Sequence, residues 1–204
     1  MKKITLLHGS KKFTGNVEIR ESKKGHYESG VGFYMTTSYN TARKYASTSQ
    51  NVMTVSLEEL NFLNGQHKLP VDDFLDFIDS QYRMKGKNKV MREFYNHVES
   101  NNIMKVQSFI NLLIISESLA GKTGINLANW LVEKGIDAII ENHVNQDWVI
   151  LFNAQKVIDI KKNVHNFEDV KRVKEQINEN QIKYEKQILS EKLPVKKNEY
   201  NLKK

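Results

Sequence analysis

The sequence predicts an α+β fold in which short strands at both ends of the chain surround a helical insert. Short apolar runs bounded by glycine or polar turns lie within residues 4–57 and again within residues 136–160. Between them, residues 71–119 have the apolar spacing of helices. The first strands have too few neighbours nearby in the sequence to form a sheet alone, so we expect strands from the two ends to pair at long range.

The N-terminal elements each have a local signal. The first apolar run ends at His8-Gly9-Ser10, and residues 11–30 have the polar, aperiodic character of a loop. Ser38 is a typical N-cap residue for the short helix that follows it. The predicted elements are a strand at 4–7, a glycine-flanked strand at 30–36, a helix at 41–46 and a strand of alternating polarity at 51–57.

The middle of the chain predicts helices and the region after it predicts strands. Pro70 opens a segment with acidic residues in its first turn, as the helix dipole favours. Gly121 and Gly124 are expected to form a helix C-cap and turn, and Gly135 to end the next helix. The predicted helices are 71–78, 88–101, 103–119 and 126–134, and the predicted strands are 136–140, 148–152 and 157–160.

Composition excludes several classes of function. The chain has 204 residues, of which 39% are hydrophobic, enough for one compact domain. It has no cysteine, which excludes disulfides, thiolate nucleophiles and zinc–thiolate sites. No two of its six histidines have the i, i+4 spacing of a zincin, so no metal site is expected. Because no apolar run approaches ~18 residues and the N-terminal run is too short for a secretory signal, we expect no membrane span and a cytoplasmic location.

The net charge of +7 is concentrated at the two ends of the chain. Residues 1–50 hold nine basic and three acidic residues, residues 51–160 hold ten and fourteen, and residues 161–204 hold twelve and seven. Two explanations fit this distribution equally well. The first is a solvated surface with a charged tail, and the second is a surface that binds a polyanion. Clustered Lys and Arg bind phosphate groups without sequence preference, so the second explanation implies a nucleic-acid partner.

Four residues form a more informative pattern. His8 follows the first apolar run, Tyr34 lies in the glycine-flanked strand, Tyr45 lies eleven residues later on the short helix, and Asp147 begins a late strand. Taken singly, each has a structural explanation: a loop histidine, two half-buried tyrosines and an aspartate that ends a turn. Together with the sequence around them, they match a known family.

These segments resemble the ADP-ribosyltransferases of the His-Tyr-Glu class, the diphtheria-toxin and poly(ADP-ribose)-polymerase type. The resemblance covers about residues 4–160, is most specific in the first fifty residues, and is greatest to small bacterial and phage-associated members, many of them toxins. The stretches that carry it are 6–10 (LLHGS), 30–36 (GVGFYMT), 42–46 (ARKYA), 131–140 (LVEKGIDAII) and 147–155 (DWVILFNAQ).

The resemblance and the composition together predict a domain organisation, although residues 71–119 and the tail after Lys162 lie outside the resemblance. Residues 1–162 would form a catalytic domain with the split antiparallel β-sheet of the ADP-ribosyltransferase fold. A helical insert at about 71–119 would interrupt this domain. Residues 163–204 would form a basic tail, with one or two amphipathic helices between 167 and 189 and a disordered end from Lys192.

The resemblance also implies NAD as co-substrate and assigns roles to five residues. His8 would hydrogen-bond the nicotinamide-side ribose or its 2′-hydroxyl, and Tyr34 and Tyr45 would sandwich the nicotinamide ring. The backbone of Gly9 would hold the carboxamide, and Ser10 would lie near the adenosine ribose. Two aromatic faces suit a flat leaving group, because they fix its orientation at little entropic cost.

Two further features concern close approach and charge. Gly30 and Gly32 would allow the backbone to approach the cofactor. Asp147 stands where the family usually has glutamate, whose carboxylate stabilises the positive charge on ribose as the nicotinamide bond breaks. Aspartate is one methylene shorter, and a misplacement of about 1 Å can cost roughly 100-fold in rate. Glu141 and Gln146 are the nearby alternatives, and the absence of glutamate at position 147 argues against polymer synthesis.

The expected function is that of an NAD-dependent mono-ADP-ribosyltransferase, a glycosyltransferase of toxin or effector type that modifies an intracellular nucleic acid or protein in a bacterial or phage-infected cell. One alternative is an inactive form of this fold that binds ADP-ribose or nucleic acid. Another is an interaction protein whose tail docks on a partner such as an antitoxin. Ser47-Thr48-Ser49 raises the other transferase class, which uses Arg and an ExE turn, but no ExE or QxE occurs near the late strand.

Overall fold

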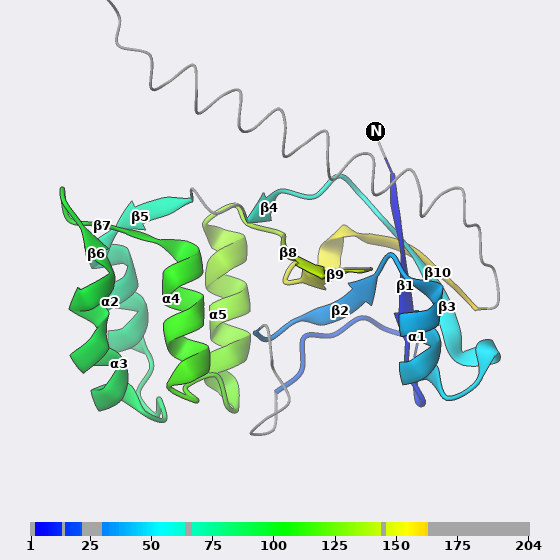
Figure 1. The fold of residues 1–204 in the computed structure, drawn as a ribbon, viewed down its shortest axis with the longest axis horizontal. Coiled ribbons are helices and arrows are strands. Elements are labelled where there is room, and N and C mark those ends of the chain that lie inside the picture. Colours follow the sequence, from blue (N-terminus) through cyan, green and yellow to red (C-terminus); the bar gives the residue numbers. More distant parts are fainter. Residues whose placement is uncertain (1–2, 14, 22–29, 64–66, 144–145, 163–204) are drawn as a thin grey trace, which may run out of the picture.

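The computed structural model describes residues 3–13, 15–21, 30–63, 67–143 and 146–162. In this part of the chain the fold is α+β, as the sequence predicts. A seven-stranded mixed sheet lies beside a group of helices that carries a second sheet of three strands (Figure 1). The predicted tail at 163–204, with its expected helices, lies outside the described residues.

The large sheet combines strands from both ends of the described chain. Its members are β1 (Ile4–Gly9), β2 (Phe33–Thr36), β3 (Val52–Leu57), β4 (Phe62–Leu63), β8 (Ala138–His143), β9 (Gln146–Leu151) and β10 (Val157–Lys162). They are arranged in the order β10-β3-β1-β2-β9-β8-β4. Helix α1 (Tyr39–Ala46) packs on β1, and the short 3-10 helices η1 (Ser49–Asn51) and η3 (Ala154–Lys156) precede β3 and β10. The expectation of long-range pairing is therefore confirmed.

Two parts of this sheet meet at β1 and β2. β1 pairs with β3 at six residue positions, and β2 pairs with β9 at four. Among the described residues, β1 and β2 share the single pair Leu7↔Thr36. The two strands run in clearly different directions in Figure 1. The sheet thus consists of two half-sheets, β10-β3-β1 and β2-β9-β8-β4, and we call the place where they meet the junction.

The two faces of the sheet are covered by different parts of the chain, because successive side chains of a strand alternate between faces. Phe13 and Val17, from the loop after β1, pack on what we call the loop face. Its core residues include Ile4, Leu6, Phe33, Met35, Val149 and Leu151. On the opposite face, which we call the helix face, Ile139 and Ile150 join the core of the helices, and Leu7 packs with α1.

The helical lobe is the second packing unit. It comprises α2 (Val71–Ser80), α3 (Lys87–Phe94), α4 (Val106–Ile115), α5 (Lys122–Glu133), η2 (Tyr95–His97) and the small sheet of β5 (Lys68–Pro70), β6 (Val98–Glu99) and β7 (Ile103–Lys105). Phe74, Phe94 and Phe109 are fully buried at its centre. α5 lies close to the segment before β2, since a Cβ added at Gly124 would come within 2.2 Å of Val31 Cγ2.

The predicted helices at 88–101 and 103–119 are wrong in their boundaries. α3 ends at Phe94, and the chain then forms a hairpin of β6 and β7 before α4 begins at Val106. The turn of this hairpin contains Asn101 and Asn102, whose φ angles are +76° and +57°. Asparagine tolerates this left-handed conformation better than most residues, so the Asn-Asn pair breaks the helix.

The expectation for Gly121 and Gly124 is also wrong. α4 ends at Ile115, and Gly121 precedes α5 as its N-cap residue with a φ of +66°. Gly124 lies inside α5 and is buried, because only glycine leaves room for Val31 at this crossing. The helix predicted at 126–134 therefore begins four residues earlier than expected.

The expected antiparallel sheet has one exception in the described chain. β4 pairs with β8 in parallel, through Phe62↔Ala138 and Leu63↔Ile139. A parallel pair needs a long crossover connection, and the helical lobe provides it between these two strands. In the described part of the chain, none of the helices is long and apolar enough to cross a membrane.

Candidate functional site

His8 lies near the end of β1, on the loop face and at the junction. Its ring stacks on Phe33 with centroids 4.2 Å apart, and Phe13 lies at 5.9 Å on another side. Nδ1 is 2.7 Å from the carbonyl oxygen of Tyr34. Burial lowers the pKa of His8, and the hydrogen bond to Tyr34 opposes this only in part. Since a carbonyl only accepts, Nδ1 of the neutral ring carries the proton, and Nε2 is left as an acceptor.

This hydrogen bond is a second contact between the two half-sheets, in addition to the residue pair Leu7↔Thr36. The Tyr34 carbonyl lies on β2 next to the position where β1 and β2 diverge. A side chain of β1 donates to it. His8 therefore has a structural role at the junction.

Gly9 and Ser10 continue β1 toward helix α1. A Cβ at Gly9 would lie 1.8 Å from the Ala42 carbonyl oxygen. α1 therefore approaches β1 more closely than any residue with a side chain at this position would allow. Ser10 donates its backbone N–H to the Asn51 carbonyl at 3.4 Å and its hydroxyl to the Lys12 carbonyl at 3.2 Å. The close packing of α1 thus accounts for Gly9, and its predicted contact with a carboxamide remains a prediction.

Tyr34 lies in β2 on the helix face, opposite to its neighbour Phe33. Its hydroxyl donates to the carbonyl of Gly30, which has a φ of +103°. Gly32 is required by packing on β9, because a Cβ there would lie 2.4 Å from Ile150 Cγ2. Protein contacts therefore account for both glycines, and a role of Gly32 toward a cofactor remains a prediction.

Tyr45 is brought to the same face by α1. The side chain of Ser38 accepts a hydrogen bond from the Thr41 N–H at 3.3 Å, which confirms the predicted N-cap. Ala42 and Ala46, one helical turn apart, are buried and fix the helix against the sheet. Tyr45 is left 58% exposed at the end of this helix.

Trp148 connects the two predicted tyrosines and was not among the predicted site residues. Its ring lies edge-on to both, with centroids 6.2 Å from Tyr34 and 5.5 Å from Tyr45. We call Tyr34, Tyr45 and Trp148 the aromatic cluster. The available signal was the position of Trp148 beside Asp147 in the late strand, but only the pairing of β2 with β9 shows which face it occupies.

Asp147 lies at the start of β9, and its carboxylate has a partner on β2. Oδ2 accepts from the hydroxyl of Thr37 at 3.3 Å, and the backbone N–H of Thr37 donates to the Asp147 carbonyl at 3.2 Å. Because Asp147 and Trp148 are adjacent in a strand, alternation places Asp147 on the loop face. The structure therefore brings Tyr34 and Tyr45 together on the helix face, whereas His8 and Asp147 belong to the loop face.

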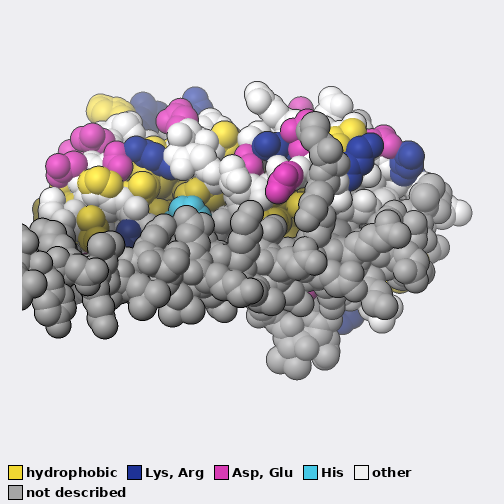
Figure 2. Space-filling model, turned by 90° about the horizontal axis from the view of Figure 1, so that it is seen from above, with side chains coloured by type: hydrophobic (Ala, Val, Ile, Leu, Met, Phe, Trp, Pro, Cys, Tyr) yellow, Lys and Arg dark blue, Asp and Glu magenta, His cyan; other side chains and the backbone are white. Residues whose placement is uncertain are grey.

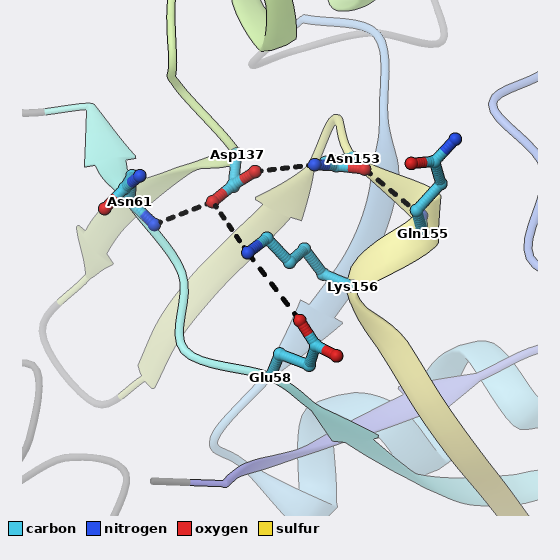
Figure 3. Close-up of polar contacts among 6 residues, drawn as sticks. All are labelled: Glu58, Asn61, Asp137, Asn153, Gln155 and Lys156. Carbon is cyan, nitrogen blue, oxygen red and sulfur yellow. Dashed lines mark hydrogen bonds and ion pairs between the residues drawn. The ribbon is translucent and has the colours of Figure 1, made fainter. Parts of the chain in front are cut away.

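A second carboxylate, Asp137, is buried at the other end of the β8–β9 hairpin (Figure 3). One oxygen accepts from the Asn61 N–H at 2.9 Å and the other from the Asn153 side-chain amide at 2.7 Å. Lys156 lies 3.9 Å from Asp137 and 3.8 Å from Glu58. Both oxygens of Asp137 are occupied by protein donors, so this carboxylate ties three segments together and is not a candidate site.

Other concave or charged features lie elsewhere. A groove of ≈ 400 Å³ between α3 and α4 is lined in part by Lys89, Glu93 and Asn111, away from the junction. Lys89 also donates to the Ile115 carbonyl at the end of α4. Among the described residues, no group of three or more His, Asp or Glu is placed to hold a metal ion.

Comparisons with known proteins give no family assignment. No protein-family model matches the chain, and no curated protein matches it. Among solved structures, a crystal structure of an anti-CRISPR protein is similar, with 13% sequence identity over 78% of this chain and 95% of that chain, and a TM-score of 0.38. A likeness at this level carries no argument about fold or function.

Proposed function

We propose that the chain is an NAD-dependent mono-ADP-ribosyltransferase with the ADP-ribosyltransferase fold of the His-Tyr-Glu class. The observation that carries this proposal is the aromatic cluster at the junction that divides the sheet into two halves, with a neutral His8 on the opposite face of the same junction. The spacing of His8, Tyr34 and Tyr45 in the sequence belongs to the same resemblance, so sequence and geometry support the proposal together.

The aromatic cluster suits the leaving group of this reaction. Nicotinamide is flat and becomes neutral when its bond to ribose breaks, and aromatic rings hold such a group by stacking. Tyr45 is more than half exposed, so one face of its ring is available to a ligand. Tyr34 and Trp148 are partly buried, which fixes the orientation of the other two rings. A held leaving group keeps the ribose in a reactive orientation.

Basic residues near the end of β1 and on α1 suit the pyrophosphate of NAD. Lys11, Lys12 and Lys44 are exposed, and Arg43 is partly exposed. Ser10 and Gly9 lie between these two groups in the fold, next to α1. We assign the nicotinamide subsite to the aromatic cluster, together with Gly32 two residues before Tyr34, and the phosphate contacts to this basic region.

The acceptor belongs to the proposal as a nucleic acid or a protein inside a bacterial or phage-infected cell. On the face shown in Figure 2, Lys and Arg side chains are interspersed with Asp and Glu over both halves of the molecule. A surface of mixed sign gives no preference for a polyanion. The support for a nucleic-acid acceptor is therefore the basic composition of residues 161–204, and the same segment is where an antitoxin would dock.

Nicotinamide release from NAD tests the reaction itself. The full chain is incubated with NAD, and free nicotinamide is measured for wild type, Tyr45→Ala and Tyr82→Ala. Tyr82 is the matched control, since it is 93% exposed on the helical lobe. We expect wild type and Tyr82→Ala to release nicotinamide at equal rates and Tyr45→Ala to be slower. Absence of release by wild type, with or without cell extract, would contradict the proposal.

Labelled NAD identifies the acceptor class. The protein is incubated with NAD labelled in the adenylate phosphate and with bacterial extract, and the product is divided between nuclease and protease. Label that survives nuclease and is lost to protease assigns a protein acceptor. The reverse result assigns a nucleic acid.

The second candidate function is an inactive form of this fold that binds ADP-ribose. The observation that favours it is the carboxylate of Asp147, which is bonded to Thr37 and lies on the face opposite to the aromatic cluster. Calorimetric titration with ADP-ribose separates the two candidates. Binding of ADP-ribose without any nicotinamide release from NAD would favour the binding module.

A further inference from the structure

The last turn of α1 is followed by a strained turn at Ser47. Ser47 has a φ of +64° and a ψ of −37°, and it follows Ala46, the last residue of the helix. The backbone N–H of Thr48 donates to the Ala46 carbonyl at 2.8 Å, which closes a γ-turn around Ser47. A γ-turn of this hand is rare and costs free energy in a residue with a side chain, so it persists only where neighbouring contacts hold it.

Asn51 supplies such contacts on both sides of this turn. Its side-chain amide donates to the Ala46 carbonyl at 3.2 Å, and its backbone N–H donates to the Thr48 carbonyl at 3.2 Å. A carbonyl oxygen has two lone pairs, so Ala46 accepts from Thr48 and from Asn51 together. Asn51 therefore caps the last turn of α1 and holds the strained turn in place.

The same residue is also bonded to the end of β1. The carbonyl of Asn51 accepts from the backbone N–H of Ser10 at 3.4 Å, directly beyond the pair Gly9↔Val52 that ends the ladder of β1 and β3. Ser10 leads into the exposed residues Lys11 and Lys12. Asn51 thus contacts the end of the helix with its side chain and the end of the strand with its backbone.

The position of Tyr45 depends on the backbone at the end of α1. Tyr45 directly precedes Ala46 and is 58% exposed, so burial of its own ring does little to fix it. Its ring meets Trp148 of β9 at a centroid distance of 5.5 Å. Ala46 is buried against the sheet, and its carbonyl is the group that Asn51 caps. A change at Asn51 should therefore move Tyr45 relative to Trp148.

We propose that Asn51 is a positioning residue that sets the spacing between the two subsites of the proposed site; this inference rests on the proposed transferase function. Tyr45 belongs to the nicotinamide subsite, and Ser10 with the lysines after it belongs to the phosphate region. NAD joins its nicotinamide to its pyrophosphate through a single ribose, so both parts bind at once only when the subsites are correctly spaced. Asn51 acts through the backbone of α1 and β1.

The test uses two variants of Asn51 in the full chain. Asn51→Asp keeps the size of the side chain but replaces the amide donor with an oxygen that the Ala46 carbonyl repels. Asn51→Ala removes the donor without adding a charge. Gln50→Glu is the matched control for charge, because Gln50 is exposed and directly precedes Asn51 in η1.

Calorimetric titration compares two ligands, NAD, which would occupy both subsites, and ADP-ribose, which would occupy the phosphate region alone. We expect both Asn51 variants to weaken NAD binding by about 10-fold and ADP-ribose binding by less than about twofold, because the loss concerns the spacing of the subsites. Gln50→Glu should bind both ligands as wild type does. An unchanged ratio of the two affinities in the Asn51 variants would overturn the inference.

A second measurement needs no ligand. In a Trp130→Phe background Trp148 is the sole tryptophan, and its emission reports how well its ring is covered. Asn51→Ala should move the emission maximum to longer wavelength, because Tyr45 would cover the Trp148 edge less well, whereas Gln50→Glu should not. An unchanged maximum in Asn51→Ala would show that Tyr45 has not moved and would also overturn the inference.

Failure of the proposed function gives a different result. If wild type binds no NAD and releases no nicotinamide, the transferase function and the role of Asn51 toward it are both overturned. If wild type is active and the Asn51 variants keep its ratio of affinities, only the role of Asn51 is overturned. Thermal unfolding identifies a variant that has lost its fold, and Asn51→Ala decides the inference if Asn51→Asp is that variant.

Discussion

The phenylalanines at the centre of the helical lobe and Tyr45 at the junction are packed in opposite ways. Phe74, Phe94 and Phe109 are fully buried and contact one another at centroid distances of 4.8 to 6.4 Å. Tyr45, in contrast, meets Trp148 at 5.5 Å and still exposes more than half of its surface. The three phenylalanines stabilise the fold by burial, whereas Tyr45 leaves apolar surface in water. Under the proposed function, a ligand would cover this surface.

The same contrast applies to how the two regions are attached. The helical lobe continues into the core on the helix face of the second half-sheet, through Ile139 and Ile150. The first half-sheet is joined to the second by one residue pair and by the bond from His8 to the Tyr34 carbonyl. Side chains of both half-sheets also share the loop-face core, so the junction is covered by one continuous core on that face. Substitutions in the helical lobe and at the junction should have different consequences.

Phe109→Ala should have the largest effect on stability. Phe109 contacts Phe74, Phe77 and Trp130 and has no exposed surface, so its removal leaves a cavity that the lobe cannot fill. We expect a loss of about 3–5 kcal/mol in the free energy of unfolding. Denaturant unfolding measures it. A loss below about 1 kcal/mol would show that the lobe is not the rigid core described above.

Gly9→Ala should have the next largest effect, and it acts on the junction. The new Cβ would lie 1.8 Å from the Ala42 carbonyl oxygen, which is backbone and cannot rotate away, so α1 must shift. Overpacking of this kind costs about 1–3 kcal/mol. Urea unfolding should detect the loss, and nicotinamide release should fall because α1 carries Tyr45. Unchanged stability would mean that α1 is free to move relative to β1.

Tyr45→Ala should change stability little, in contrast to Phe109→Ala. An exposed surface ring contributes within about 0.5 kcal/mol to the free energy of unfolding. Nicotinamide release should nevertheless fall, since the ring would stack on the leaving group. The pair of measurements distinguishes a ring kept for binding from a ring kept for folding, and a stability loss similar to that of Phe109→Ala would remove the distinction.

Local signals in the sequence predicted most elements of the fold but not their pairing. Glycines and short apolar runs marked β1, β2 and β3, and Ser38 marked the start of α1. The hairpin of β6 and β7 was missed because its apolar residues have a spacing compatible with a helix, and only Asn101-Asn102 signals the turn. The parallel pairing of β4 with β8 depends on contacts between distant segments, which no local pattern contains.

The candidate site shows the same limit more sharply. Alternation in the sequence already separates Asp147 from Trp148, because they are neighbours in a strand. It does not say which of them shares a face with Tyr34, since that depends on the register Tyr34↔Ile150 between β2 and β9. A motif therefore identified the strand that carries the proposed site, whereas the register identified Trp148 as part of the aromatic cluster.

The smallest expected effect concerns the pH dependence of stability at His8. Burial lowers its pKa in the folded protein below that of the unfolded chain, so the unfolded chain binds the proton first as pH falls. Stability is thus complete above the unfolded pKa of about 6.5 and is lost progressively as pH falls from there toward the folded pKa. His8→Gln retains an amide donor for the Tyr34 carbonyl but cannot titrate.

Denaturant unfolding of wild type and His8→Gln between pH 8 and pH 5 measures this difference, and other titrating groups cancel between the two proteins. The wild type should lose more stability than His8→Gln over this range, although His8→Gln starts slightly lower because it loses the stacking on Phe33. Parallel curves would mean that His8 is accessible to protons when folded. In that case the neutral ring, on which the proposed role of His8 toward ribose depends, would not be the form present below neutral pH.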